Sequence, residues 1–305
     1  MSPTDKLYYL KNKEINKQLW DNCIRNAENR LIYGLSFYLD ELCNWDGIVL
    51  NDYGAVMPLP WRKKWGIRYV YQPAFMQRLG VFGYHFADEI ISKIFFEASK
   101  KFFFLHYNIS QPVKCIRSSL IKHQNFIIHL DRTYNDIREC YTQECIRNIQ
   151  KAESRGCVFS NNISAEEIVK MFRSAYGELH PQLKTEDYDK LIALLKKAQG
   201  QNAVELCSVE NFSGASIYGA AIFKDSARIS YAIGAPTEEG RQKRATYFFI
   251  DHLLQKNATT GLLFDFEGSE IPSVADFYQK FGPTAEYYYE LKMSRIPFLI
   301  NYVGK

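Results

Sequence analysis

The expected order of helices and strands is the same in both halves of this chain, and this repetition constrains its fold most. Each half begins with one or two amphipathic helices, continues with a run of strands joined by short turns, and closes with a helix and a strand. Turns as short as Lys224-Asp225-Ser226 join antiparallel strands, because parallel neighbours need a longer crossover. The sequence therefore predicts an α+β protein with two tandem domains, each a mixed, mostly antiparallel sheet flanked by helices.

Hydrophobic periodicity and turn residues place the expected elements along the chain. The first half is expected to contain two helical pieces within 13–43, strands 48–50, 55–59 and 67–72, a helix at 86–101 and a strand at 102–107. The second half is expected to contain helices 164–176 and 185–200, strands 203–209, 216–223 and 228–233, and a helix at 240–256, followed by strand 262–267, helix 273–281 and strand 285–292. A strand at 126–130 and a long helix ending at Gly156 connect the halves, so we expect domains at 1–158 and 159–305.

Composition and charge exclude several classes of protein. The net charge is only +4 and no basic stripe or nucleic-acid module is recognisable, so nucleic acid is not an expected partner. No apolar run approaches 18 residues and the N-terminus does not resemble a signal peptide, so neither a membrane span nor secretion is expected. The seven cysteines have no zinc spacing, which favours a reduced, cytoplasmic protein without a metal site. The oligomeric state is left open.

A group of cations stands at the start of the helix expected at 240–256. Arg241, Lys243 and Arg244 lie in its first turn, where positive charge is unfavourable for the helix dipole. The arrangement is explained if an anion such as a phosphate binds the free N–H groups of that turn. The alternative is a solvated charge cluster beside Glu238 and Glu239.

Two carboxylates stand near the end of the strand expected at 262–267. Asp265 and Glu267 alternate with Phe264 and Phe266, so the acids and the aromatic rings face opposite sides of the sheet. A carboxylate at the edge of a cleft could take a proton from an amine nucleophile. Alternatively, these acids bond nearby arginines or backbone groups, or cap the next helix.

Together these segments resemble the GNAT acyltransferase superfamily, and in particular its tandem-domain FemABX-like branch. The resemblance rests on Asp265-Phe266-Glu267-Gly268, on Phe277-Tyr278-Gln279-Lys280-Phe281-Gly282, and on RNIQKAESRG at 147–156. It implies two tandem GNAT-like (acyl-CoA N-acyltransferase) domains. The N-terminal one is expected to be a non-catalytic scaffold and the C-terminal one to carry the donor site.

The resemblance also implies an activity and roles for individual residues. The expected reaction is transfer of an acyl group from acyl-CoA, such as acetyl-CoA, to an amine of a small molecule or peptide. Glu267 is the expected general base, with Asp265 or Tyr288 orienting it. The donor phosphates are expected to contact Gly240, Arg241, Lys243, Arg244 and Ala245. The acceptor is expected to contact Arg147, Lys151, Tyr231 and Lys280, and the alternative for Arg147 and Lys151 is a solvated helix face.

Two alternatives remain beside this interpretation. Arg244 stands where the superfamily's phosphate-binding motif has a glycine, which puts a large side chain where phosphate approaches the backbone. The protein could therefore be an aminoacyl-tRNA-dependent peptidyltransferase acting on a cell-wall precursor, as in FemABX-like enzymes. It could also be a non-catalytic binding protein on the same fold.

Overall fold

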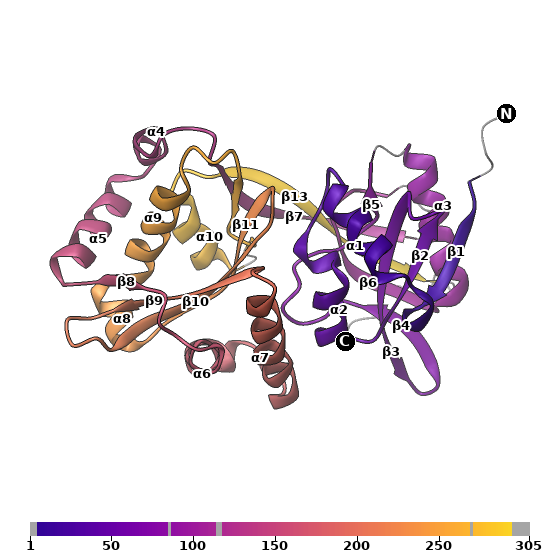
Figure 1. Cartoon of the computed structure of the whole chain (residues 1–305), viewed down its shortest axis with the longest axis horizontal. Helices are drawn as coiled ribbons and strands as arrows, with labels where there is room; N and C mark the ends of the chain where they lie inside the picture. Colours follow the sequence, from indigo (N-terminus) through magenta and orange to yellow (C-terminus); the bar gives the residue numbers. More distant parts are fainter. Residues whose placement is uncertain (1–4, 85–86, 114–117, 269–270, 295–305) are drawn as a thin grey trace. The chain divides into compact units, whose positions relative to one another are not determined.

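The computed structural model describes residues 5–84, 87–113, 118–268 and 271–294, and the chain forms two compact units (Figure 1). Unit 1 comprises Met1–His123 with Tyr287–Lys305, and unit 2 comprises Gln124–Glu286. Within the described ranges, no helix is long and apolar enough to cross a membrane.

In unit 1 the strand order is β1, β2, β3, β4, β6, β13, all antiparallel except that β4 runs parallel to β6. The strands are β1 Leu7–Lys11, β2 Trp45–Leu50, β3 Ala55–Lys64, β4 Ile67–Tyr71, β5 Phe82–Gly83, β6 Phe104–Ile109 and β13 Thr284–Ser294, with β5 paired to β3. The helices are α1 Lys17–Asn26, α2 Ser36–Leu42 and α3 Asp88–Lys101. β1 was not expected from the sequence.

In unit 2 the strand order is β8, β9, β10, β11, β12, β7, again antiparallel except that β11 runs parallel to β12. The strands are β7 Ser118–His129, β8 Val158–Ser160, β9 Val204–Glu210, β10 Ser216–Lys224, β11 Arg228–Pro236 and β12 Leu263–Asp265. The helices are α4 Tyr134–Glu139, α5 Gln143–Ser154, α6 Ala165–Tyr176, α7 Thr185–Gly200, α8 Glu238–Lys243, α9 Ala245–Asn257 and α10 Pro272–Gln279.

The strands of the two units have the same pairing order, which confirms the predicted α+β fold and the repetition between halves. Each unit has four antiparallel strands, a parallel neighbour and a final antiparallel strand. The final strands are exchanged between the halves of the sequence: β13 pairs with β6, whereas β7 pairs with β12. The units therefore differ from the expected ranges 1–158 and 159–305, because residues 124–158 pack in unit 2 and the chain from Tyr287 belongs to unit 1.

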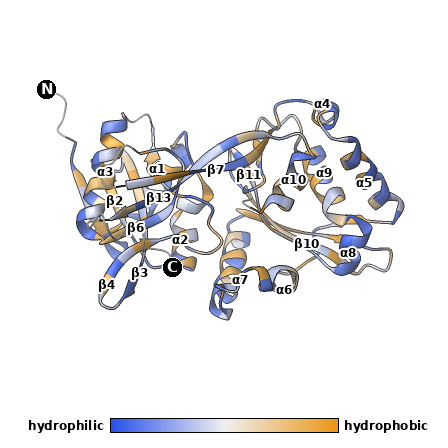
Figure 2. Cartoon of the chain, turned by 180° about the vertical axis from the view of Figure 1, so that it is seen from behind, coloured by the Kyte–Doolittle hydropathy of each residue, from blue (hydrophilic) through white to orange (hydrophobic). Residues whose placement is uncertain are grey.

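Helices cover both faces of the sheet in unit 2 (Figure 1). On one face α5, α9 and α10 enclose a core that includes Ile149, Phe249 and Phe281. On the other face α6 lies so close to β10 that a Cβ on Gly219 would stand 2.9 Å from the sulfur of Met171. The amphipathic pattern of α5 is visible as its alternation of hydrophilic and hydrophobic residues (Figure 2).

Two helices that periodicity predicts as continuous are each divided in the structure. The long helix before Gly156 is broken between α4 and α5, and the hydroxyl of Thr142 caps α5 by accepting from the N–H of Cys145 at 3.2 Å. The helix expected at 240–256 is broken at Arg244, whose φ of 64° is left-handed. Both breaks preserve the apolar face, so the periodicity does not reveal them.

Candidate functional site

A cavity opens in unit 2 where β11 and β12 diverge. The two strands pair only from Arg228 to Ser230, after which β11 continues to Pro236 while the chain beyond β12 turns away. The cavity has a volume of about 670 Å³, within the range of small-molecule sites. Its aromatic lining comes from Phe172, Tyr176, Tyr231, Tyr247, Phe266, Phe277 and Tyr278.

A β-bulge in β11 shapes one wall of this cavity. Ala221 pairs with Ile233 and Ile222 pairs with Tyr231, so Ala232 is left out of the register with β10. Such a bulge bends the strand and increases its twist. Gly234 then leaves space for two tyrosine hydroxyls, since a Cβ there would lie 2.2 Å from the hydroxyl oxygens of Tyr218 and Tyr231.

The buried tyrosines of the wall remain protonated. Burial raises the pKa of Tyr231 and that of Tyr278 above the ordinary value. Tyr231 shares a short hydrogen bond with Tyr218, and the ring of Tyr278 lies 4.6 Å from that of Phe266. These phenols can therefore donate or accept hydrogen bonds toward a ligand without carrying charge.

The cavity is bordered by exposed cations at the junction of α8 and α9. Arg241 and Arg244 both line it, as does Thr246 in the first turn of α9. The guanidinium of Arg241 lies 5.5 Å from the ring centroid of Tyr176, an attractive cation–π contact. This group combines two positive side chains with the start of a helix, which suits a phosphate or another anion.

Arg244 holds a conformation that glycine adopts without strain. Its φ of 64° and ψ of 31° place it in the left-handed region between two helices. A non-glycine residue in this region costs about 1 kcal/mol relative to glycine. The side chain of Arg244 adds a cation to the lining of the cavity.

We expect Arg244→Gly to leave the fold intact and to raise the free energy of unfolding slightly, by up to about 1 kcal/mol, because the left-handed strain disappears. Arg244→Ala keeps the strain and should show no such gain. Urea denaturation of both variants measures the difference. A clear loss of stability in Arg244→Gly would mean that the arginine side chain contributes to the fold.

The other residues expected to bind donor phosphates have different surroundings. Gly240 lines the cavity, but a Cβ there would lie 2.0 Å from the carbonyl oxygen of Ile217, so its small size allows α8 to pack on β10. Lys243 forms an ion pair with Glu239 at 3.1 Å. Ala245 is fully buried at the start of α9. Neither Lys243 nor Ala245 is among the residues described as lining the cavity.

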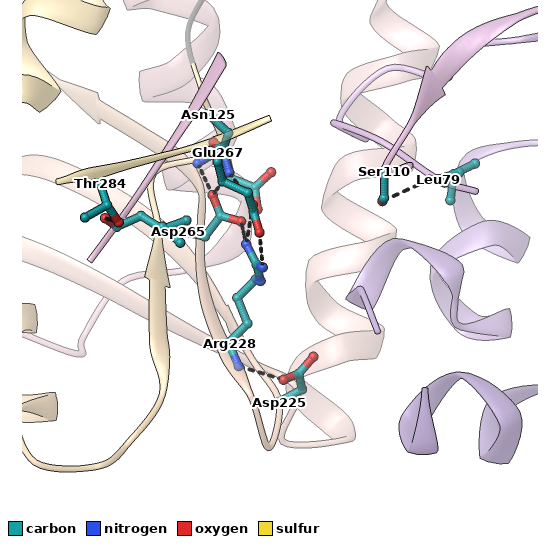
Figure 3. A network of polar contacts seen from close by, with 10 residues as sticks. Leu79, Ser110, Asn125, Asp225, Arg228, Asp265, Glu267 and Thr284 are labelled. Carbon is teal, nitrogen blue, oxygen red and sulfur yellow. Dashed lines mark hydrogen bonds and ion pairs between the residues drawn. The ribbon is translucent and has the colours of Figure 1, made fainter. Parts of the chain in front are cut away.

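Asp265 and Glu267, expected as catalytic residues, lie in one polar network (Figure 3). The buried carboxylate of Asp265 accepts from Arg228, from the amide of Asn125 at 2.9 Å and from the backbone N–H of Glu267 at 2.8 Å. Arg228 also donates to both carboxylate oxygens of Glu286, at 2.9 and 3.1 Å. Burial alone would lower the pKa of Arg228, but these two carboxylates raise it above its ordinary value.

Glu267, two residues after this anchored aspartate, lines the cavity. Like Arg244 it is a non-glycine residue in the left-handed region, with φ of 64°. The bond from its N–H to Asp265 holds the turn that places it there. Strained backbone of this kind is a reason to suspect function at the residue that bears it.

The remaining expected residues are distributed over several elements. Tyr231 lines the cavity. Tyr288 belongs to unit 1, where its ring stacks on His123 at 5.2 Å. Lys280 is paired with Glu144 at 2.5 Å. Arg147 and Lys151 are exposed on α5, and in the described part of the chain the cavity lining includes neither them nor Lys280.

The part of the wall that comes from α6 and the turn after it was not predicted from the sequence. Phe172, Tyr176 and His180 line the cavity, and the ring of His180 stacks on that of Phe172 at 6.3 Å. The spacing of four residues between Phe172 and Tyr176 on one side of α6 is the signal that could have identified these two, whereas His180 lies beyond the helix.

Comparisons with known proteins show likeness in structure but not in sequence. No protein-family model matches the chain, and no curated protein is significantly similar to it. The crystal structure of FemX superimposes with a TM-score of 0.70 at 11% identity, over 98% of this chain and 100% of that chain.

Two further structures extend the comparison. The C-terminal domain of a putative lysylphosphatidylglycerol synthetase from Agrobacterium fabrum gives a TM-score of 0.60 at 9% identity, over 96% of this chain and 95% of that one. A tandem GNAT protein from the clavulanic acid biosynthesis pathway gives 0.52 at 11% identity, over 95% and 98%. The chain therefore has the tandem GNAT-like fold of the FemABX-like kind, as its motifs predicted.

Proposed function

We propose that this protein, whose fold is that of tandem GNAT-like acyltransferases, transfers an acyl group from acyl-CoA to an amine acceptor. The observation that carries the proposal is the cavity at the divergence of β11 and β12, because its lining includes two arginines, a helix start and a carboxylate. These are the parts that an anionic donor and an amine nucleophile require.

The proposed donor site lies at the start of α9. Arg241 and Arg244 would pair with the phosphates, and the N–H groups of Ala245 and Thr246 at the start of α9 would add hydrogen bonds, because that of Tyr247 already donates to the carbonyl of Arg244. The hydroxyl of Thr246 would add another. The acyl chain would lie along β11, whose backbone between Tyr231 and Pro236 no longer pairs with β12.

The proposed chemistry is direct attack of the acceptor amine on the thioester carbonyl. The amine nitrogen forms the new C–N bond, the C–S bond breaks, and the departing thiolate is protonated, so the net reaction moves one proton from the amine to the sulfur. Glu267 would take the proton from the amine, directly or through a water molecule. Backbone N–H groups of β11 would stabilise the oxyanion, and Asp265 would fix the turn that carries Glu267.

A second candidate is an aminoacyl-tRNA-dependent transferase. It is favoured by the likeness to FemX, and by the side chain of Arg244 at a position where a glycine would let a phosphate approach the backbone closely. In this case the same arginines would bind the 3′ end of the tRNA. A binding protein without catalysis is the third candidate and rests on the same departure at Arg244.

Calorimetric titration with acetyl-CoA tests the donor. We expect micromolar affinity, about −8 kcal/mol, and a weakening of roughly tenfold or more in Arg241→Ala and in Arg244→Ala, because each removes a charged hydrogen bond to phosphate. Lys256→Ala is the matched control, since this cation lies at the other end of α9 and pairs with Glu205. Its affinity should equal that of the unmodified protein.

Each result separates the candidates. An absence of heat at millimolar acetyl-CoA would exclude the leading proposal, and formation of an amide product from charged tRNA would then support the second. Binding that all three variants retain would place the donor elsewhere in the molecule. Binding without turnover over a broad set of amines would favour the third candidate.

A further inference from the structure

The hairpin that joins β3 to β4 carries an exposed tryptophan at its tip. The hairpin projects from the remainder of unit 1 (Figure 1). Lys64 and Ile67 form its last paired residues, and Trp65 and Gly66 make the turn with φ of 50° and 82°. Trp65 is 89% exposed, the largest exposure among the bulky hydrophobic side chains of the described residues.

Folding does not account for a tryptophan at this position. A two-residue turn with positive φ at both residues favours asparagine, aspartate or glycine at the first, and a bulky side chain there is strained. The indole also remains in water, where its apolar surface is unfavourably hydrated. An asparagine in place of Trp65 would satisfy the turn better, so the indole points to an interaction outside the chain.

Positive charge accompanies the indole along β3, the first strand of the hairpin. Arg62, Lys63 and Lys64 are exposed, whereas Arg68, opposite Lys63, is paired with Asp46 within the unit. Ile67 adds a second apolar side chain at the tip, 43% exposed. The tip is therefore apolar, and a group of cations lies directly beside it on β3.

We propose that this hairpin binds the surface of an anionic phospholipid bilayer. Tryptophan prefers the interface between headgroups and acyl chains, and adjacent lysines gain attraction from anionic headgroups. The geometry matches both requirements, because Trp65 and Ile67 would enter the interface while Lys63, Lys64 and Arg62 reach the phosphates. The inference concerns unit 1 alone and does not depend on the activity proposed for unit 2.

A bilayer fits these residues better than an RNA strand does. A nucleobase would stack on a face of the indole, and the ammonium of Lys64, 4.8 Å from the centroid of that ring, occupies one of its two faces. Ile67 offers a base no stacking surface. The same two features suit a membrane, since Lys64 can contact a phosphate while the indole edge and Ile67 are in the apolar interface.

Vesicle flotation of the full-length protein tests the proposal. We expect binding to vesicles of phosphatidylcholine with about 30% phosphatidylglycerol, little binding to pure phosphatidylcholine, and release by high salt. Trp65→Asn should lower the affinity roughly tenfold while keeping or raising stability, because asparagine fits the turn. Lys63→Gln with Lys64→Gln should lower it by roughly fivefold for each lysine removed.

The matched control is Phe212→Ser, which removes another exposed aromatic side chain at a turn beside a lysine, in unit 2. It should leave vesicle binding unchanged. Tryptophan fluorescence should shift to the blue on vesicle addition, and the shift should vanish in Trp65→Asn. Equal binding by Trp65→Asn, no binding to anionic vesicles, or binding to RNA in place of vesicles would each overturn the proposal.

Discussion

Replacing Arg228 with methionine is expected to lower the free energy of unfolding by about 3–5 kcal/mol, because it leaves the buried carboxylate of Asp265 and the half-buried one of Glu286 without their counter-charge. Only 11% of the Arg228 side chain and 1% of that of Asp265 are exposed. The variant also removes the two donor bonds to Glu286. Urea denaturation followed by far-ultraviolet circular dichroism would measure the loss.

The control for this prediction is Lys196→Met, which breaks an exposed ion pair with Glu166. Exposed pairs contribute little, so this variant should unfold at the same urea concentration as the original protein. Combining Arg228→Met with Asp265→Asn should recover part of the loss, because the second change removes one uncompensated charge. If Arg228→Met alone were as stable as the original protein, the network would have no structural role.

The structural role of Asp265 follows from the same network. Its carboxylate is held by Arg228 and Asn125 and in turn binds the N–H of Glu267. An acid engaged in this way is suited to positioning Glu267 rather than to exchanging protons with a substrate. Destabilisation in Arg228→Met would therefore affect the site through the turn after β12.

The repeated order of elements was sufficient to predict the fold but not the exchange of its final strands. Alternating apolar residues indicate that a strand is half-buried, yet they do not say which sheet it joins. Residues 126–130 were thus assigned to the first half, whereas β7 pairs with β12. Pairing between distant strands depends on tertiary packing, which periodicity does not encode.

The candidate site was predictable where local chemistry was unusual. Cations at a helix start and carboxylates at a strand end indicated Arg241, Arg244 and Glu267, and the cavity lining contains all three. The aromatic wall from α6 was not predicted, because the positions of Phe172 and Tyr176 are as typical of core residues as of residues that line a cavity. The left-handed turn at Arg244 was not predicted either, because arginine gives no signal for positive φ.

Glu267→Gln is expected to lower kcat by about 10² to 10⁴ while the affinity for the donor stays the same, because the proton acceptor is lost and the cations remain. Glutamine has the same size and can occupy the left-handed position as glutamate does. The fold should therefore be unchanged in circular dichroism and thermal unfolding. Rates should be measured with whichever donor, acetyl-CoA or charged tRNA, the binding experiments support.

A dependence on pH separates proton transfer from a structural role of Glu267. If Glu267 is the base, the original enzyme should lose activity at acidic pH, because a protonated carboxyl cannot accept a proton, and this acidic limb should disappear in Glu267→Gln. Glu267→Gly provides a second comparison, because it relieves the left-handed strain and should be inactive without being less stable. Unchanged turnover in Glu267→Gln would exclude Glu267 as the base and would direct attention to the buried tyrosines of the same cavity.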